Sequence, residues 1–301
     1  MECLRRACAP ETQELIRLVS RHNHATRASG ADEVRPFWTV VRDLIISEKP
    51  RLCVFDLKLP DWSSIWHHVR DSIPSTTHSI GVDVPVQWID QFDDVIHPGV
   101  TSPKDARGSG NWHGGPEWVL VDRDPVWHPN REEESITVTT GSQSFTSFHS
   151  WLGAELRYLF RLGADVSWVV GTHFEDKIAE LQSHSRSVKY VTDENLINRF
   201  TSSVFVMARF GVTVFELAAR GVPTLVLPEW NSNEELEILE LERNGVVIVA
   251  RSRGEVGKLG ESLLNNISLQ HQLSEASKAY FRLEATHPAS DLIGLRISGN
   301  Q

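Results

Sequence analysis

The chain has 301 residues, a hydrophobic fraction of 40% and a formal net charge of −10, which suits one large domain or two of ordinary size. The acidic balance, with a pI near 5.7, argues against nucleic-acid binding, because a phosphate backbone requires a basic surface. We expect no membrane span, since no apolar run approaches the roughly 20 residues that cross a bilayer. Three cysteines without disulfide or zinc spacing indicate a cytoplasmic protein.

The first part of the chain alternates helices with short buried strands. The apolar patterns predict helices over 11–21, 37–47 and 62–70, and strands over 51–56, 79–83 and 94–98. Two of these strands end in a carboxylate, Asp56 and Asp83. Ligands of open α/β sheets bind outside the carboxyl ends of strands, so both are candidate site residues, although an aspartate there can also simply cap the next helix.

A glycine-rich polar stretch, residues 101–117, predicts a loop in the middle of the chain. Its His113 is a weaker candidate for a ligand site, because a histidine in such a loop is more often solvated. We place the domain boundary beyond this loop. The prediction is an α/β domain over 1–125 and a second α/β domain over 126–301.

The second part is a regular β/α series. It predicts strands over 135–140, 166–170, 187–191, 204–207, 224–227 and 246–250, and helices over 147–162, 194–200, 234–243, 255–265 and 269–281. Such alternation indicates a parallel sheet with helices on both faces. Gly141 and Gly171 follow two of the strands, and Asn231 follows a third, at the edge where ligands bind.

The most regular unit is Val204–Pro228, which predicts a strand, a glycine turn, a helix and a strand. Gly211 opens the turn and Thr213 can cap the helix that follows. Gly221 is the expected left-handed residue after the helix, and Pro223 prevents the helix from continuing. An ordinary strand-to-helix connection would have the same pattern, and Glu216 would then be an acid favoured by the helix dipole.

The stretch FGVTVFELAARGVPTLVLPEWNSNEE resembles the nucleotide-sugar-binding segment of the two-domain GT-B fold, including that of the peptidoglycan N-acetylglucosaminyltransferase. Four further pieces, in order, resemble the UDP-sugar hydrolases of pseudaminic acid synthesis and the related spore-coat polysaccharide proteins. They are VFDLKLPDWSSIW, SIGVDVPVQWIDQFDDVIHPG, GPEWVLVDRDPVWHPNRE and TVTTGSQSFTS. The resemblance covers roughly residues 54–249. It implies two Rossmann-like lobes with parallel sheets and a cleft between them.

The resemblance also implies roles for individual residues. Gly211, Val212 and Thr213 would hold the diphosphate of a UDP-sugar with main-chain amides at a helix start. Glu216 would accept hydrogen bonds from the ribose hydroxyls. Gly141 and Ser142 would approach the phosphates or the sugar, and Asn231 the sugar. Gly171 is added as a strand-end residue. Neither a cofactor nor a metal ion is expected.

The sequence departs from the hydrolases where their chemistry lies. Family members open with a strand and a Gly-x-Gly-His loop, whose histidine is the expected base, and this sequence begins too late to contain it. Asp56 or Asp83 would then be the remaining base. We therefore carry three hypotheses: a UDP-sugar hydrolase of surface polysaccharide or nonulosonic acid synthesis, a GT-B glycosyltransferase with a UDP-sugar donor, and a nucleotide-sugar binder without catalysis.

Overall fold

The computed structural model describes residues 37–56, 66–67, 69–101, 111–121, 126–129, 135–141, 145–171, 175–184, 188–192, 196–232, 234–281 and 287–298. The chain divides into two compact units, Met1–Leu120 with Leu283–Gln301, and Val121–Arg282. We had expected residues 126–301 to form a single domain. The last stretch of the chain instead groups with the first unit. The helix predicted over 11–21 lies outside the described residues.

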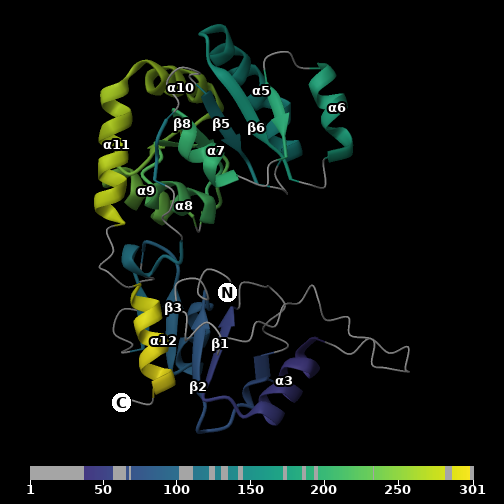
Figure 1. Ribbon diagram of the computed structural model, residues 1–301, viewed down its shortest axis with the longest axis vertical. Coiled ribbons are helices and arrows are strands. Elements are labelled where there is room, and N and C mark those ends of the chain that lie inside the picture. The colour runs from purple at the N-terminus through teal and green to yellow at the C-terminus, as the bar shows by residue number, and fades with distance from the viewer. Residues whose placement is uncertain are drawn as a thin grey trace. The chain divides into compact units, whose positions relative to one another are not determined.

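The first unit is built on a four-stranded parallel sheet in the order β1-β2-β3-β4 (Figure 1). Its strands are β1 (Leu52–Asp56), β2 (His78–Val82), β3 (Asp94–His97) and β4 (Trp112–Gly114). The helical elements are α3 (Phe37–Glu48), α12 (Pro288–Ser298) and the 3-10 turns η2 (Val86–Gln91) and η4 (Pro116–Trp118). The predicted strands 51–56, 79–83 and 94–98 are thus confirmed to within one residue at each end.

Both faces of this sheet are covered. On one face α12 packs Leu292 and Ile293 against Ile80, Val82 and Ile96 of β2 and β3. The other face carries an aromatic cluster, in which the rings of Trp66 and Phe92 stack at 4.5 Å between centroids. Burial on both faces explains why these strands are continuous apolar runs in the sequence.

The second unit is built on a six-stranded parallel sheet in the order β10-β9-β8-β5-β6-β7 (Figure 1). Its strands are β5 (Ser135–Thr139), β6 (Asp165–Val169), β7 (Lys189–Val191), β8 (Phe205–Ala208), β9 (Thr224–Val226) and β10 (Ile248–Val249). Its helices are α5 (Phe145–Arg161), α6 (Glu175–His184), α7 (Leu196–Ser202), α8 (Val212–Ala219), α9 (Glu235–Arg243), α10 (Val256–Asn265) and α11 (Ile267–Tyr280), with a 3-10 turn η6 (Arg253–Glu255).

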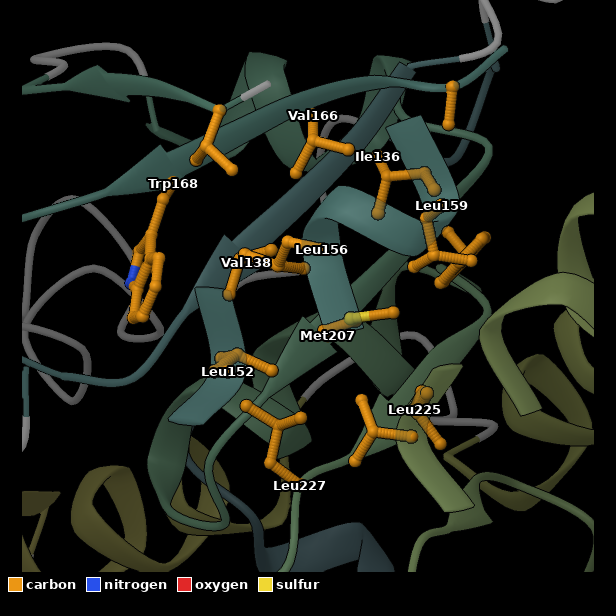
Figure 2. Packing of buried hydrophobic residues seen from close by; sticks show 14 of the residues in the cluster. Ile136, Val138, Leu152, Leu156, Leu159, Val166, Trp168, Met207, Leu225 and Leu227 are labelled. Atoms are coloured by element: carbon orange, nitrogen blue, oxygen red, sulfur yellow. The ribbon is translucent and has the colours of Figure 1, made fainter. Parts of the chain in front are cut away.

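The core of the second unit joins this sheet to α5. Figure 2 shows Leu152, Leu156 and Leu159 of α5 meeting the side chains of Ile136, Val138, Val166, Met207 and Leu225 from the strands. All eight residues are at most 1% exposed. α10 packs beside α5, and Gly260 allows the close approach because a Cβ there would lie 2.8 Å from Met207 Cε and 3.0 Å from Leu159 Cδ1.

Three elements differ from the prediction. Residues 112–114, expected in a loop, form β4, which pairs with β3. The helices α6 and α12 were not predicted at all. Among the described side chains of α6, the core contacts come from Ile178 and Leu181, which make an apolar stripe too narrow to recognise in the sequence.

Candidate functional site

The candidate site lies at the carboxyl edge of the second sheet. β5 is the first strand of this sheet in chain order. The chain then adds β6 and β7 on one side of β5, and returns to add β8, β9 and β10 on the other side. The connections after β5 and β8 therefore leave the sheet in opposite directions from two adjacent strands. A doubly wound sheet opens a crevice at such a switch point, and ligands bind there outside the strand ends.

Gly211 and the start of α8 form one side of this switch point. Gly211 has φ 155° and ψ −170°, a backbone region that only glycine occupies readily. No side chain caps the helix here, and a Cβ placed on Gly211 would meet no atom within 4 Å. The first amides of α8 therefore begin at an open backbone position, which is the arrangement that suits an anion. Val212, the first helical residue, is 48% exposed.

Gly141 forms the other side. It lies two residues beyond the end of β5, has φ 72°, and a Cβ there would also meet no atom within 4 Å. Gly171 lies just beyond β6, the next strand. The structure thus brings Gly141, Gly171 and Gly211 to one edge of one sheet. Ser142 lies outside the described residues.

Glu216 lies one turn along α8 from Thr213, and both side chains are half-buried. The same helix ends in Arg220, which is 3% exposed and donates from Nη1 to the main-chain oxygen of Glu216 at 3.0 Å. The bond from Arg220 thus ties the end of α8 to the main chain at Glu216, the fifth residue of this eight-residue helix.

Asn231 follows β9, adjacent to β8, but its side chain already has a structural role. Its Oδ1 accepts the main-chain N–H of Glu234 at 3.1 Å, while Glu234 Oε2 accepts the N–H of Asn231 at 2.9 Å. This reciprocal pair is a capping box at the entry to α9. The side-chain oxygen that the sequence assigned to the sugar is thus engaged in the protein itself.

Arg209 is a site residue that the sequence analysis missed. It follows β8 directly, and its N–H donates to the carbonyl of Thr139, the last residue of β5, at 3.0 Å. Its side chain lies 3.9 Å from Glu234 and is 35% exposed. The main chain of Arg209 thus bridges the ends of β5 and β8, so this arginine belongs to the switch point. The sequence does contain a signal for this residue: an arginine comes directly after a buried strand and two residues before the glycine of a turn.

In the first unit, Asp56 ends β1 and Asp83 directly follows β2, so both belong to the carboxyl edge of adjacent strands. Asp83 has φ 55°, and its N–H donates to the carbonyl of Ile96. Aspartate tolerates this left-handed region better than most residues do. The two aspartates that the sequence singled out therefore stand at the ends of adjacent strands of the first sheet.

A second titratable cluster lies at the amino edge of the first sheet. Asp94, 2% exposed, accepts from His113 Nε2 at 2.8 Å, from His78 Nε2 at 2.6 Å and from Arg296 Nε at 3.0 Å. Burial raises the pKa of Asp94, but the hydrogen bonds from these three residues outweigh it and hold the pKa below its usual range. The cluster fastens the end of α12 to the sheet, and it accounts for His113.

The other reactive groups offer little chemistry. Burial raises the pKa of the Cys53 thiol to about 11, so at neutral pH it is protonated and not a nucleophile. Among the described residues, no group of three or more His, Cys, Asp or Glu side chains could hold a metal ion. No helix within the described ranges combines the length and apolarity that crossing a bilayer demands.

Comparison with known proteins identifies the fold. The sequence matches no protein-family model and no curated protein. The structure resembles the S. aureus MnaA–UDP co-structure with a TM-score of 0.59 at 14% identity, over 87% of this chain and 79% of that one. It resembles Acinetobacter baumannii MurG with a TM-score of 0.58 at 12% identity, over 87% of this chain and 77% of that one.

A UDP-N-acetylglucosamine 2-epimerase is similar to the same degree, with a TM-score of 0.58 at 14% identity, over 88% of this chain and 77% of that one. The predicted fold class is therefore confirmed: the protein has a GT-B-like α/β fold with two Rossmann-like units, each built on a parallel sheet. At sequence identities of 12–14%, the similarity to these structures concerns the fold alone.

Proposed function

We propose that the protein binds a UDP-sugar at the carboxyl edge of its second sheet and transfers the sugar to an acceptor. The observation that carries this proposal is the meeting of two open glycine turns, Gly141 and Gly211, on adjacent strands at the switch point. Both turns let a ligand approach the main chain, and α8 begins at the second of them.

In this proposal each group at the edge has a distinct task. Main-chain amides at Gly211, Val212 and Thr213 face the diphosphate, and Arg209 adds a positive charge. Glu216 accepts from the ribose hydroxyls. Gly141 and Gly171 leave room for the phosphates and the sugar, and Ser142 is the next residue of the first turn. Asn231 shapes the loop beside the sugar, because its Oδ1 and its main-chain N–H are both bonded to Glu234. Acidic composition does not oppose this, since amides and one arginine supply the local positive charge.

Uridine is the nucleoside we infer from the similar structures. One of them is a complex with UDP, and another is a UDP-N-acetylglucosamine 2-epimerase. UDP-N-acetylglucosamine is therefore the first donor to test. The acceptor must be activated by a base, and Asp56 and Asp83 are the two candidates for it.

Hydrolysis is the second candidate function, because five sequence pieces between residues 54 and 249 resemble UDP-sugar hydrolases. In that case water takes the place of the acceptor, and UDP is released when no other acceptor is present. The third candidate function is nucleotide-sugar binding without turnover, in which case the protein would be a nucleotide-sugar binder and not a catalyst.

Titration calorimetry with UDP tests the binding step. We expect Glu216→Gln to weaken UDP binding, because an amide accepts hydrogen bonds from the ribose less strongly than a carboxylate does. The matched control is Glu275→Gln, on α11 and 74% exposed, which should bind as the wild type does. If wild-type protein does not bind UDP, the proposal fails.

Turnover then separates the three functions. UDP release from UDP-N-acetylglucosamine is measured with water alone and with candidate hydroxyl acceptors. Release that requires an acceptor supports transfer, and release in water supports hydrolysis. Binding without release in either assay supports the binder. Asp56→Asn and Asp83→Asn, assayed separately, identify the base.

A further inference from the structure

Glu229, just after β9, has an unusual backbone conformation. It follows Pro228 and has φ 81°, one of three positive φ values among the non-glycine residues described, with Lys49 and Asp83. A side chain with a Cβ avoids this region, so such a residue persists only where its surroundings hold it. Glu229 lies two residues before Asn231 and three residues beyond β9, the strand next to β8. It therefore belongs to the edge of the sheet that carries the candidate site.

An ion pair holds Glu229. Arg253 donates from Nε to Glu229 Oε1 at 2.6 Å, and its Nη2 contacts the same oxygen. The guanidinium lies over the ring of Trp151 at 5.2 Å from the centroid, and the Trp151 Nε1 is itself buried. Glu229 follows β9, Arg253 belongs to η6 and Trp151 to α5, so this latch joins three elements that are distant in sequence.

A second arginine contacts the next residue of the loop. The guanidinium of Arg251 lies 5.6 Å from the centroid of the Trp230 ring and also pairs with Glu242 of α9. The capping box between Asn231 and Glu234 fixes the end of the loop. Residues 229, 230 and 231 each have a side chain in contact with another part of the second unit, so these contacts, rather than the backbone preference of the loop, set its path.

The chemistry of this loop suits a sugar better than a diphosphate. The two arginines next to this loop, Arg251 and Arg253, make close ion pairs with carboxylates, whereas the pair between Arg209 and Glu234 is longer, at 3.9 Å. What remains is an aromatic ring beside carboxylate oxygens, which repel phosphate but accept hydrogen bonds from hydroxyl groups. The diphosphate is better served one strand away, where Arg209 and the start of α8 lie.

We propose that the Glu229–Arg253 pair, stacked on Trp151, is a positioning latch that holds residues 229–231 against the sugar of the bound nucleotide-sugar. The inference rests on the proposed function. It assigns Glu229 and Arg253 no contact with the reacting atoms. Breaking the latch lets the backbone at Glu229 relax out of its positive-φ region, and the loop then withdraws from the sugar while the nucleotide contacts stay in place.

The test compares the affinities for UDP and for UDP-N-acetylglucosamine. Arg253→Met keeps an apolar stem on Trp151 but removes every donor to Glu229. The expected result is an unchanged Kd for UDP and a Kd for UDP-N-acetylglucosamine raised about tenfold, because small misplacements of positioning groups cost factors of that order. Glu229→Gly should raise this Kd less, since glycine keeps φ 81° without strain even though it cannot make the pair.

The matched control is Lys189→Gln. It breaks an exposed ion pair of the same unit, Lys189–Asp165, which lies at the first residues of β7 and β6 and therefore at the opposite edge of the sheet. A general loss of stability would affect this control as much as Arg253→Met, and melting temperatures are measured for all variants. The control should leave the ratio of the two Kd values unchanged.

Hydrogen exchange supplies a second measurement that needs no ligand. Peptides covering 227–234 should exchange faster in Arg253→Met than in wild type, while those covering α10 should not. An unchanged Kd ratio in a wild-type background that binds UDP overturns the latch and leaves the proposed function standing. A wild-type protein that binds neither nucleotide overturns the proposed function and the latch with it.

Discussion

The Nδ1 atom of His287 accepts the main-chain N–H of Ala289 at 3.1 Å. An imidazole nitrogen that accepts carries no proton, so the other nitrogen, Nε2, carries it and donates to the carbonyl of Val119 at 3.1 Å. His287 thus caps the start of α12 and ties it to Val119, the residue after η4. Both bonds require the same neutral tautomer, with the proton on Nε2.

Replacing His287 separates these two bonds. His287→Ala should lower the free energy of unfolding of the first unit by about 2 kcal/mol, because it removes a helix cap and leaves a buried carbonyl without its donor. His287→Asn should lower it less, since asparagine is a good cap. Hydrogen exchange of residues 288–298 measures both. Equal losses in the two variants would show that the cap contributes nothing.

Asp94 makes the other end of α12 sensitive to acid. Its pKa is lowered in the folded protein, so its contribution is fully present above the unfolded value, about 4, and is lost as the pH falls through the folded value. Asp94→Asn should cost about 3 kcal/mol at pH 7, because the amide removes the negative charge and keeps only one of the two oxygens that accept from His78, His113 and Arg296. It should also flatten the acid dependence of exchange in β3 and α12.

Arg296→Gln is the companion variant for this experiment. It removes one of the three donors and leaves His78 and His113 in place, so it should cost less than Asp94→Asn and keep most of the acid dependence. If both variants lose the same stability, the histidines do not contribute to holding the carboxylate.

The sequence predicts the second sheet well because its strands are buried on both faces. Phe205, Val206 and Met207 of β8 are all fully buried, so the strand is a continuous apolar run, and the glycine turn that follows has a local chemical cause. Glycine at Gly211 is required by the backbone itself. Both the strand and the turn are therefore encoded within a few residues of each other.

Features made by distant contacts escape such analysis. α12 contains Gly294 and few strong helix formers, and it packs on Ile80 and Ile96, some 200 residues earlier in the chain. The strand β4 exists because β3 lies beside it. The left-handed Glu229 depends on Arg253, 24 residues later. Nothing in the local sequence indicates any of these three relationships.

Glycine substitutions test the geometry of the switch point. Gly211→Ala should destabilise the second unit by about 1–3 kcal/mol, even though the added methyl group meets no neighbour, because φ 155° with ψ −170° excludes a Cβ. Gly141→Asn should cost less, since asparagine tolerates φ 72°. Thermal unfolding of each variant measures the difference.

Gly254→Ala is the control for these variants. Gly254 also has open space around its Cβ position, but it has no positive φ, so alanine should be neutral or slightly stabilising. A loss at Gly211 no larger than at Gly254 would mean that the backbone there relaxes freely, and the preformed turn would no longer explain anion binding.

Arg209 is the remaining residue whose role follows from its place between β5 and β8. If it contacts the diphosphate, Arg209→Gln should weaken UDP binding about tenfold, or about 1.4 kcal/mol, and should make the remaining affinity less sensitive to salt, because one charge pair is lost. Arg243→Gln, an exposed arginine in the last turn of α9, is the control and should change neither quantity. A loss of equal size in both variants would reflect net charge alone.

Unchanged binding in Arg209→Gln would leave the main-chain amides of α8 as the whole of the anion site.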